Sequence, residues 1–185
     1  MLLLQPYRRE YAYRYAQRWA LGRNPLFLNF SGIGGDCTNF ISQCLYAGRC
    51  VMNETPTFGW YYHTASRRTA SWTGVQYLYD FLTTNEGPGP FAQEVGAGDL
   101  LLGDVIQLGD ASGRFYHSLL VVGFTSRSYL VAAHSYDAWE MPLTSYFYDR
   151  ARFLHIPGIR AWREPGVPLP AEPPCFAGLI AGERI

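Results

Sequence analysis

The spacing of apolar residues changes along the chain, and this change constrains the fold more than any other feature of the sequence. In the first half, apolar and aromatic residues recur three and four positions apart, which predicts helices over residues 9–21, 37–47 and 71–85. In the second half, short runs rich in Val, Leu, Ile and Tyr are broken by turn residues, which predicts strands within residues 100–110, 116–126, 128–137 and 151–158. Helices followed by an antiparallel meander predict an α+β fold.

The length predicts one compact domain. With 185 residues, of which 48% are hydrophobic, the chain can build one real core and is too short for two comfortable ones. We assign residues 1–160 to this domain. Residues 161–185 are so rich in Pro and Gly that we expect no regular structure there, and this C-terminal tail is predicted to be dispensable for the core fold.

The charge pattern argues against a nucleic-acid partner. The formal net charge is zero and the fifteen basic residues are all Arg, spread without a basic run, so no nucleic-acid groove is predicted. The start, MLLLQPYRRE, lacks the organisation of a secretory signal, and no apolar stretch approaches the length of a transmembrane helix. We therefore expect no transmembrane segment and a cytoplasmic location by default, with export by another route left open.

The four cysteines, Cys37, Cys44, Cys50 and Cys175, do not have the spacing of a small disulfide framework. Cys37 and Cys44 lie two helical turns apart and cannot bridge within one helix. Cys44 and Cys50 could close across the helix end. Because the sequence contains no C-x-x-C pair, no structural zinc knuckle is predicted.

Residues 34–43, GGDCTNFISQ, place Cys37 where a glycine-rich loop becomes a helix. Asp36 is a good N-cap residue, and Cys37 falls in the first turn. Unpaired backbone N–H groups and the helix dipole favour the thiolate there, and the thiolate is the nucleophilic form of cysteine. The alternative is a small hydrophobic residue packed in the core.

Two histidines on the predicted strands are candidates for a base and its orienting partner. His117 opens one strand, and His134 ends the next strand with Asp137 three residues later. A thiol nucleophile needs a base and a group that orients the base. For each histidine alone, the alternative is an ordinary core or surface residue. A zinc site built from Cys37, His117 and His134 is a further alternative, but no ligand spacing is diagnostic, so no metal or cofactor is predicted.

These motifs carry a resemblance. GGDCTNFISQCLYAG, preceded by NPLFLNF and followed in order by SWTG, GDVIQL, YHSLLVVG and AAHSYD, resembles the putative amidase domain family, related to the NlpC-type and CHAP cysteine peptidases and amidases, over roughly residues 7–156. The resemblance implies a papain-like/NlpC-type fold, with N-terminal helices packed on a small antiparallel β-sheet or barrel. It also implies that Cys37 is the nucleophile, His117 the base and His134 the third, polar residue, with Asp137 as the competing candidate for the third position.

The predicted function is hydrolysis of an amide bond in a peptide or peptidoglycan-like substrate, by a cysteine amidohydrolase or peptidase. The Cys37 N–H would bind the oxyanion together with Asn29 or Ser31. We assign Asn29, Asp36, Trp60 and Asp137 as candidate substrate-binding residues. The alternative function is a catalytically idle module that captures a peptide or glycan on the aromatic loop at residues 51–74.

Overall fold

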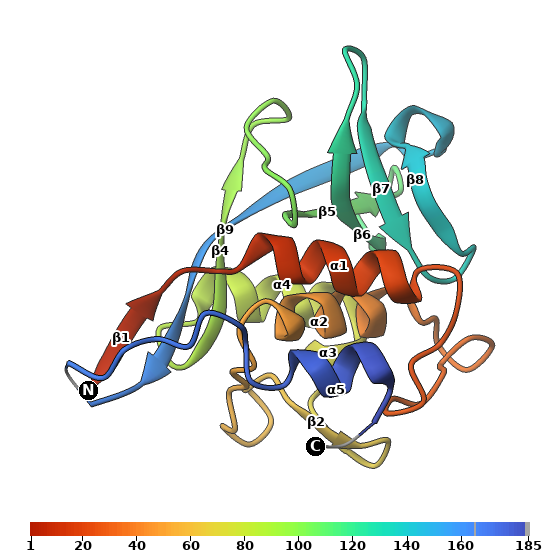
Figure 1. Ribbon diagram of the computed structural model, residues 1–185. Coiled ribbons are helices and arrows are strands. Elements are labelled where there is room, and N and C mark those ends of the chain that lie inside the picture. The colour runs from red at the N-terminus through yellow and green to blue at the C-terminus, as the bar shows by residue number, and fades with distance from the viewer. Residues whose placement is uncertain (165, 184–185) are drawn as a thin grey trace.

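The computed structural model describes residues 1–164 and 166–183. In these residues a bent antiparallel sheet carries helices on one of its faces, and a small hairpin lies apart from the sheet (Figure 1). The predicted α+β class with an antiparallel sheet is therefore confirmed.

Seven strands form the sheet. Six follow one another across it in the order β1 (Leu2–Gln5), β9 (Arg150–Trp162), β5 (Val105–Gly109), β6 (Phe115–Phe124), β7 (Tyr129–Ala133) and β8 (Ala138–Pro142), while β4 (Gly89–Val95) also pairs with β9. The predicted meander of three strands is present as β5, β6 and β7. The last predicted strand does not extend the meander, because β9 pairs with β5 on its other side.

The helices pack on one face of this sheet. They are α1 (Arg9–Trp19), α2 (Cys37–Ala47), α3 (Ala70–Thr73), α4 (Val75–Thr84) and α5 (Phe176–Ala181), with a 3-10 turn η1 (Leu143–Ser145). The helix predicted over residues 71–85 is divided at Gly74, whose backbone is extended. None of the helices in the described residues is long and apolar enough to cross a membrane.

Strand alternation divides the interior into two cores. Leu120 on β6 and its partner Ala132 on β7 belong to the core beneath the helices, whereas their neighbours Leu119, Val121 and Val131 belong to a second core on the other face. Because successive side chains of a strand point to opposite faces, this division also decides which face each polar residue of β6 occupies.

Both tryptophans of the aromatic loop belong to the core. Trp60 and Trp72 are fully buried, with their ring centroids 4.7 Å apart, and Trp60 Nε1 donates to Ser42 Oγ. The chain there forms the small hairpin of β2 (Tyr62–Thr64) and β3 (Arg67–Arg68), which precedes α3. The prediction that Trp60 binds substrate is therefore wrong, because a buried indole offers no surface to a ligand.

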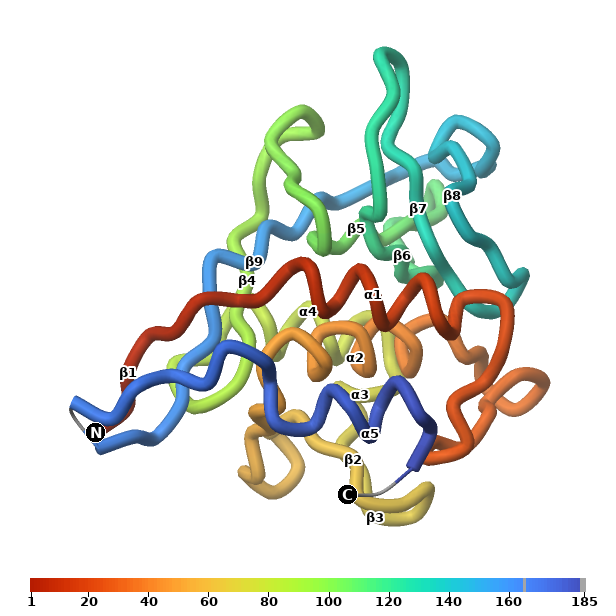
Figure 2. Tube along the Cα trace, in the orientation of Figure 1, coloured from red at the N-terminus to blue at the C-terminus, as the bar shows by residue number. Residues whose placement is uncertain are grey.

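Part of the C-terminal segment is ordered, which corrects the expectation that residues 161–185 lack regular structure: β9 continues to Trp162, and α5 covers Phe176–Ala181. Residues 163–164 and 166–175 contain no helix or strand, as predicted, and residues 165, 184 and 185 lie outside the described residues. Figure 2 shows α5 running beside α1. The Phe176 ring meets the Tyr11 ring edge-on with centroids 4.6 Å apart, and Trp19 donates from its indole to the Leu179 carbonyl. A disulfide joins Cys50 to Cys175, in place of the pairing of Cys44 with Cys50 that the sequence left open.

We expect removal of this disulfide to destabilise the protein. The double substitution Cys50→Ala and Cys175→Ala removes a cross-link between residues 125 positions apart. A disulfide that closes so long a loop strongly restricts the unfolded chain. The expected loss is about 2–4 kcal/mol of unfolding free energy, measured by urea denaturation. Adding a reductant should lower the stability of the wild type and leave that of the double variant unchanged. A wild type that is insensitive to reductant would contradict this.

Candidate active site

Cys37 is the first residue of α2 and its thiol lies against the start of β6. The thiol is 6% exposed and accepts a hydrogen bond from the Ser118 backbone, and Thr38 Oγ1 lies 3.8 Å from Sγ. The Thr38 and Ser118 hydroxyls are 3.0 Å apart and join the helix to the strand. The chain thus brings Cys37 next to the backbone of the residue that follows His117.

The electrostatic state of Cys37 differs from the one expected from the sequence. Burial raises the pKa of the thiol, and the hydrogen bonds from Ser118 and Thr38 offset only part of that increase. The helix start alone predicted a stabilised thiolate. Desolvation instead favours the neutral thiol in the free enzyme, so Cys37 needs a base to become a nucleophile.

His117 lies at the head of β6, on the face opposite to Ser118. Burial lowers the pKa of its ring to about 4, so the ring is neutral near pH 7. Its side chain is 8% exposed, and Nε2 is buried without a hydrogen-bond partner among the described residues. Tyr146 packs beside it, with ring centroids 5.9 Å apart. No hydrogen bond joins the His117 ring to Cys37 within the described part of the chain, and catalytic hydrogen bonds are often long before substrate binds.

His134 does not orient His117, which corrects the role expected for it. Its Nδ1 is 2.7 Å from Asp36 Oδ2 and its Nε2 is 2.9 Å from the Trp19 carbonyl, so both ring nitrogens are engaged elsewhere. The register explains this. His134 follows Ala132 on the helix-facing side of β7, whereas His117 shares its face of β6 with Leu119, on the other side of the sheet.

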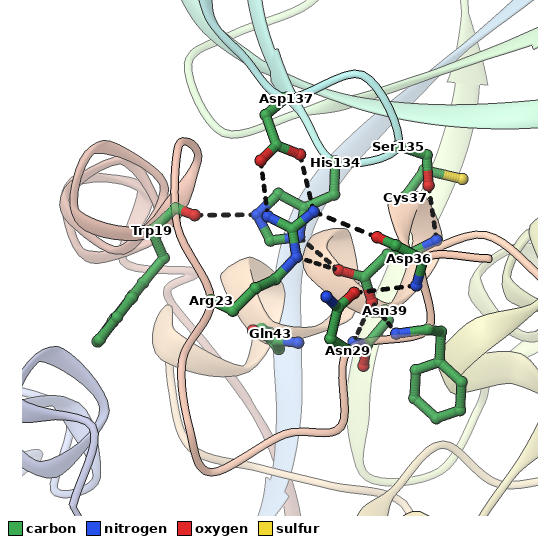
Figure 3. A network of polar contacts seen from close by, with 12 residues as sticks. Trp19, Arg23, Asn29, Asp36, Cys37, Asn39, Gln43, His134, Ser135 and Asp137 are labelled. Carbon is green, nitrogen blue, oxygen red and sulfur yellow. Dashed lines mark hydrogen bonds and ion pairs between the residues drawn. The ribbon is translucent and has the colours of Figure 1, made fainter. Parts of the chain in front are cut away.

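Asp36 is the centre of a buried polar network (Figure 3). Its fully buried carboxylate contacts His134, accepts hydrogen bonds from Asn39 Nδ2 and the Phe30 N–H, and lies 3.0 Å from Arg23 Nε. Burial alone would raise the pKa of this carboxyl group, but the hydrogen bonds outweigh burial and lower it.

Asp36 occupies the N-cap position of α2, as predicted, whereas its expected role as a substrate ligand is wrong. Its side chain makes no capping hydrogen bond to α2, and its burial leaves no oxygen for a substrate.

The two remaining substrate-binding candidates have local partners. Asp137 forms a bidentate ion pair with Arg23, with both N–O distances 2.8 Å. It therefore anchors the loop before α2 and does not orient the His117 ring. Asn29 is exposed, and its Oδ1 accepts the Ser31 N–H. Ser31 Oγ in turn lies 3.3 Å from Arg23.

Sequence reasoning missed Ser135, which lies in the turn between β7 and β8 and contacts the residue before Cys37. Its Oγ accepts a hydrogen bond from the Asp36 N–H at 2.7 Å (Figure 3). Nothing in the local sequence signals this contact, because the two residues are 99 positions apart and meet only through the packing of the β7–β8 turn on the loop before α2.

A zinc site has no support in the described residues. No group of three His, Cys, Asp or Glu side chains lies in an arrangement that could hold a metal ion there. Cys37, His117 and His134 are divided between the two faces of the sheet and the helix layer.

Together the fold and these residues define an α+β domain with a thiol at a helix start and a neutral histidine on the neighbouring strand. The chain belongs to the family described as "Putative amidase domain", whose family model matches residues 6–156. The description of this family suggests, at a coarse level, hydrolysis of amides.

A curated relative is known by sequence. The chain is 35% identical over 136 residues to "Uncharacterized protein YhbB" of Bacillus subtilis (strain 168), an alignment that covers 71% of this chain and 42% of the relative. The chain thus spans about two fifths of the length of that relative. No solved structure matches the chain.

We expect His117 to make stability depend on pH. Its pKa is about 4 in the folded protein and near 6.5 when unfolded, so between these values the unfolded chain binds more protons. Stability should therefore fall as the pH drops from 6.5 to 4, by at most about 3 kcal/mol from this group. His117→Gln should show a shallower decline in urea denaturation across this range. If the stability of the variant falls with pH as steeply as that of the wild type, the His117 ring is not buried in its neutral form.

Proposed function

We propose that this protein is a cysteine amidohydrolase or peptidase. The observation that carries the proposal is the contact between the Cys37 thiol and the backbone of Ser118, which places the nucleophile beside β6, the strand that carries His117 near its start. A papain-like arrangement, with the thiol at a helix start and the histidine at a strand start, is the architecture that we propose for the site.

The proposed reaction begins with both groups neutral. In the first step the His117 ring, which lies on the other face of β6 in the structure, turns toward the thiol around the start of the strand and accepts its proton. The Cys37 sulfur attacks the amide carbonyl carbon at the same time, and the carbonyl π electrons move to oxygen. The protonated ring then donates this proton to the leaving amine, and a thioester on Cys37 remains. Water attacks the thioester, with His117 again taking a proton, and releases the acid and the free thiol. The lowered pKa of His117 suits the first step, because the ring must be neutral to act as a base.

The surroundings support a peptide-type substrate with an apolar group. Phe147 is 97% exposed and adjoins Tyr146, which packs on His117, while Tyr136 is 92% exposed and adjoins Ser135. Exposed aromatic side chains beside a reactive centre offer stacking and apolar contact to a ligand. Peptide and peptidoglycan-like amides both belong to this class. The binding-module alternative loses Trp60 and Trp72, which are core residues, and keeps the exposed Phe58 of the same loop.

Trapping of the acyl-enzyme tests the proposal. Incubation with p-nitrophenyl acetate at pH 7 should give a burst of one equivalent of p-nitrophenolate, and peptide mass spectrometry should find the acetyl group on Cys37. Cys44, the other free thiol, is fully buried and serves as the internal control. Acylation at both thiols at equal rates, or at neither, would overturn the proposal.

We also propose that the domain works in an oxidising compartment. The disulfide between Cys50 and Cys175 supports this, because such bonds persist mainly outside the reducing cytosol. The sequence alone favoured the cytoplasm. Alkylation of freshly lysed cells that express the protein from its own gene, followed by non-reducing mass spectrometry, should find the two cysteines joined. Free thiols at both positions in the cell would overturn this proposal.

A further inference from the structure

The turn between β7 and β8 is strained and rigidly placed. Ser135 and Tyr136 have φ values of 60° and 88°, and Ala133 pairs with Ala138 on either side of them. Positive φ at both central residues is required in type I′ hairpin turns, which favour Asn and Gly there. Strained conformations of other residues persist where the surrounding structure holds them, and they cluster at functional sites.

The buried network holds this turn against the start of α2. His134 before the turn contacts Asp36, Asp137 after it pairs with Arg23, and Ser135 Oγ accepts the Asp36 N–H (Figure 3). The Ser135 hydroxyl is therefore held by the N–H of Asp36, the residue that directly precedes Cys37.

Two hydrogen-bond donors at this place have no acceptor. Among the described residues, neither the Cys37 N–H nor the Ser135 O–H donates to a protein group. The Cys37 N–H belongs to the unpaired first turn of α2, and Ser135 uses its oxygen as an acceptor, which leaves its hydrogen free.

We infer that Ser135 is a catalytic residue that binds the oxyanion together with the Cys37 N–H. This inference rests on the proposed function. When the Cys37 sulfur bonds to the carbonyl carbon, the oxygen takes up the π electrons and accepts hydrogen bonds from both donors. Collapse returns the electrons to the C=O bond and expels the amine protonated by His117. Ser135 transfers no proton, so its contribution is the stabilisation of the negative oxygen.

Ser135 fits this role better than the two candidates suggested by the sequence. Asn29 is exposed, and its side chain is held through Oδ1 by the Ser31 N–H of the same exposed loop, so its Nδ2 donor is placed less firmly than the Ser135 hydroxyl. Ser31 is exposed and lies beside the Arg23 guanidinium. A donor on a hairpin turn that is pinned on both sides is held in place before the substrate arrives, as oxyanion binding requires.

The test compares acyl transfer with alkylation at the same thiol. Ser135→Ala and Ser135→Gly both remove the hydroxyl, and the glycine variant also relieves the positive φ. Ser31→Ala is the matched control. Each variant is assayed for the rate of Cys37 acylation by p-nitrophenyl acetate and for the rate of Cys37 alkylation by iodoacetamide as a function of pH. Alkylation displaces iodide at a saturated carbon and develops no oxyanion.

We expect both Ser135 variants to slow acylation by about 10²- to 10³-fold while the alkylation rate and its pH profile stay within about twofold of the wild type. Ser31→Ala should behave as the wild type in both assays. Ser135 variants that acylate normally, or that lose acylation and alkylation by the same factor, would overturn the inference and leave the proposed function standing. A wild type that alkylates but is never acylated would overturn both.

Discussion

Cys37→Ala is expected to abolish amide and ester hydrolysis, with a loss of at least about 10⁴-fold in kcat. The thioester cannot form without the sulfur, and removal of a catalytic nucleophile typically costs several orders of magnitude. The measurement is steady-state hydrolysis of an activated ester and of a peptide anilide. The unfolding free energy should change by only about 1 kcal/mol, since the thiol is small and contributes few packing contacts.

Cys44→Ala provides the matched control. Cys44 lies on the same helix two turns later, is fully buried, and belongs to the helix-facing core. Its replacement should reduce stability through a small cavity and leave kcat within about twofold of the wild type. Hydrolysis by the Cys37 variant within tenfold of the wild type would show that the thiol is not the nucleophile, whatever the stability of the variant.

Asp36→Asn is expected to destabilise the protein by about 3–5 kcal/mol. The fully buried carboxylate accepts hydrogen bonds from Asn39 and from the Phe30 N–H and lies 3.0 Å from Arg23, so an amide there removes the buried negative charge and sets an N–H donor against these donors. Urea denaturation at pH 7 measures the loss. Because the pKa of Asp36 is lowered in the folded state, the stabilisation is present above the ordinary carboxyl value of 3.8 and is lost as the pH falls below it.

Asp137→Asn is the control for this substitution. Asp137 pairs with the same Arg23, but in a partly exposed position where solvent screens the charges. Its replacement should cost less than about 1 kcal/mol. Equal losses for the two variants would show that the position of Arg23, rather than the buried charge of Asp36, accounts for the effect.

Much of the fold could be predicted because it follows from periodicity. The helix at residues 9–21 is present as α1 over Arg9–Trp19, and the helix that begins at Cys37 is present as α2 over Cys37–Ala47. The strands β5 and β7 fall within the predicted runs, and β6 begins one residue before its predicted run. Periodic apolar faces are local signals, and the core satisfies them wherever they occur. Edge strands such as β1 and β8 lack such a face and were not predicted.

The candidate site divides in the same way. The sequence alone placed Cys37 at a helix start, His117 at a strand start, and both on adjoining elements of an α+β domain, because each of these features is local. Only the tertiary structure decided that His134 faces Asp36, that Trp60 is core and that Cys50 bonds to Cys175. These outcomes depend on which face of a strand meets the helices and on contacts between residues about a hundred or more positions apart in the chain. Hydrogen bonds, burial and charge pairing across such separations leave no trace in the local pattern of residues.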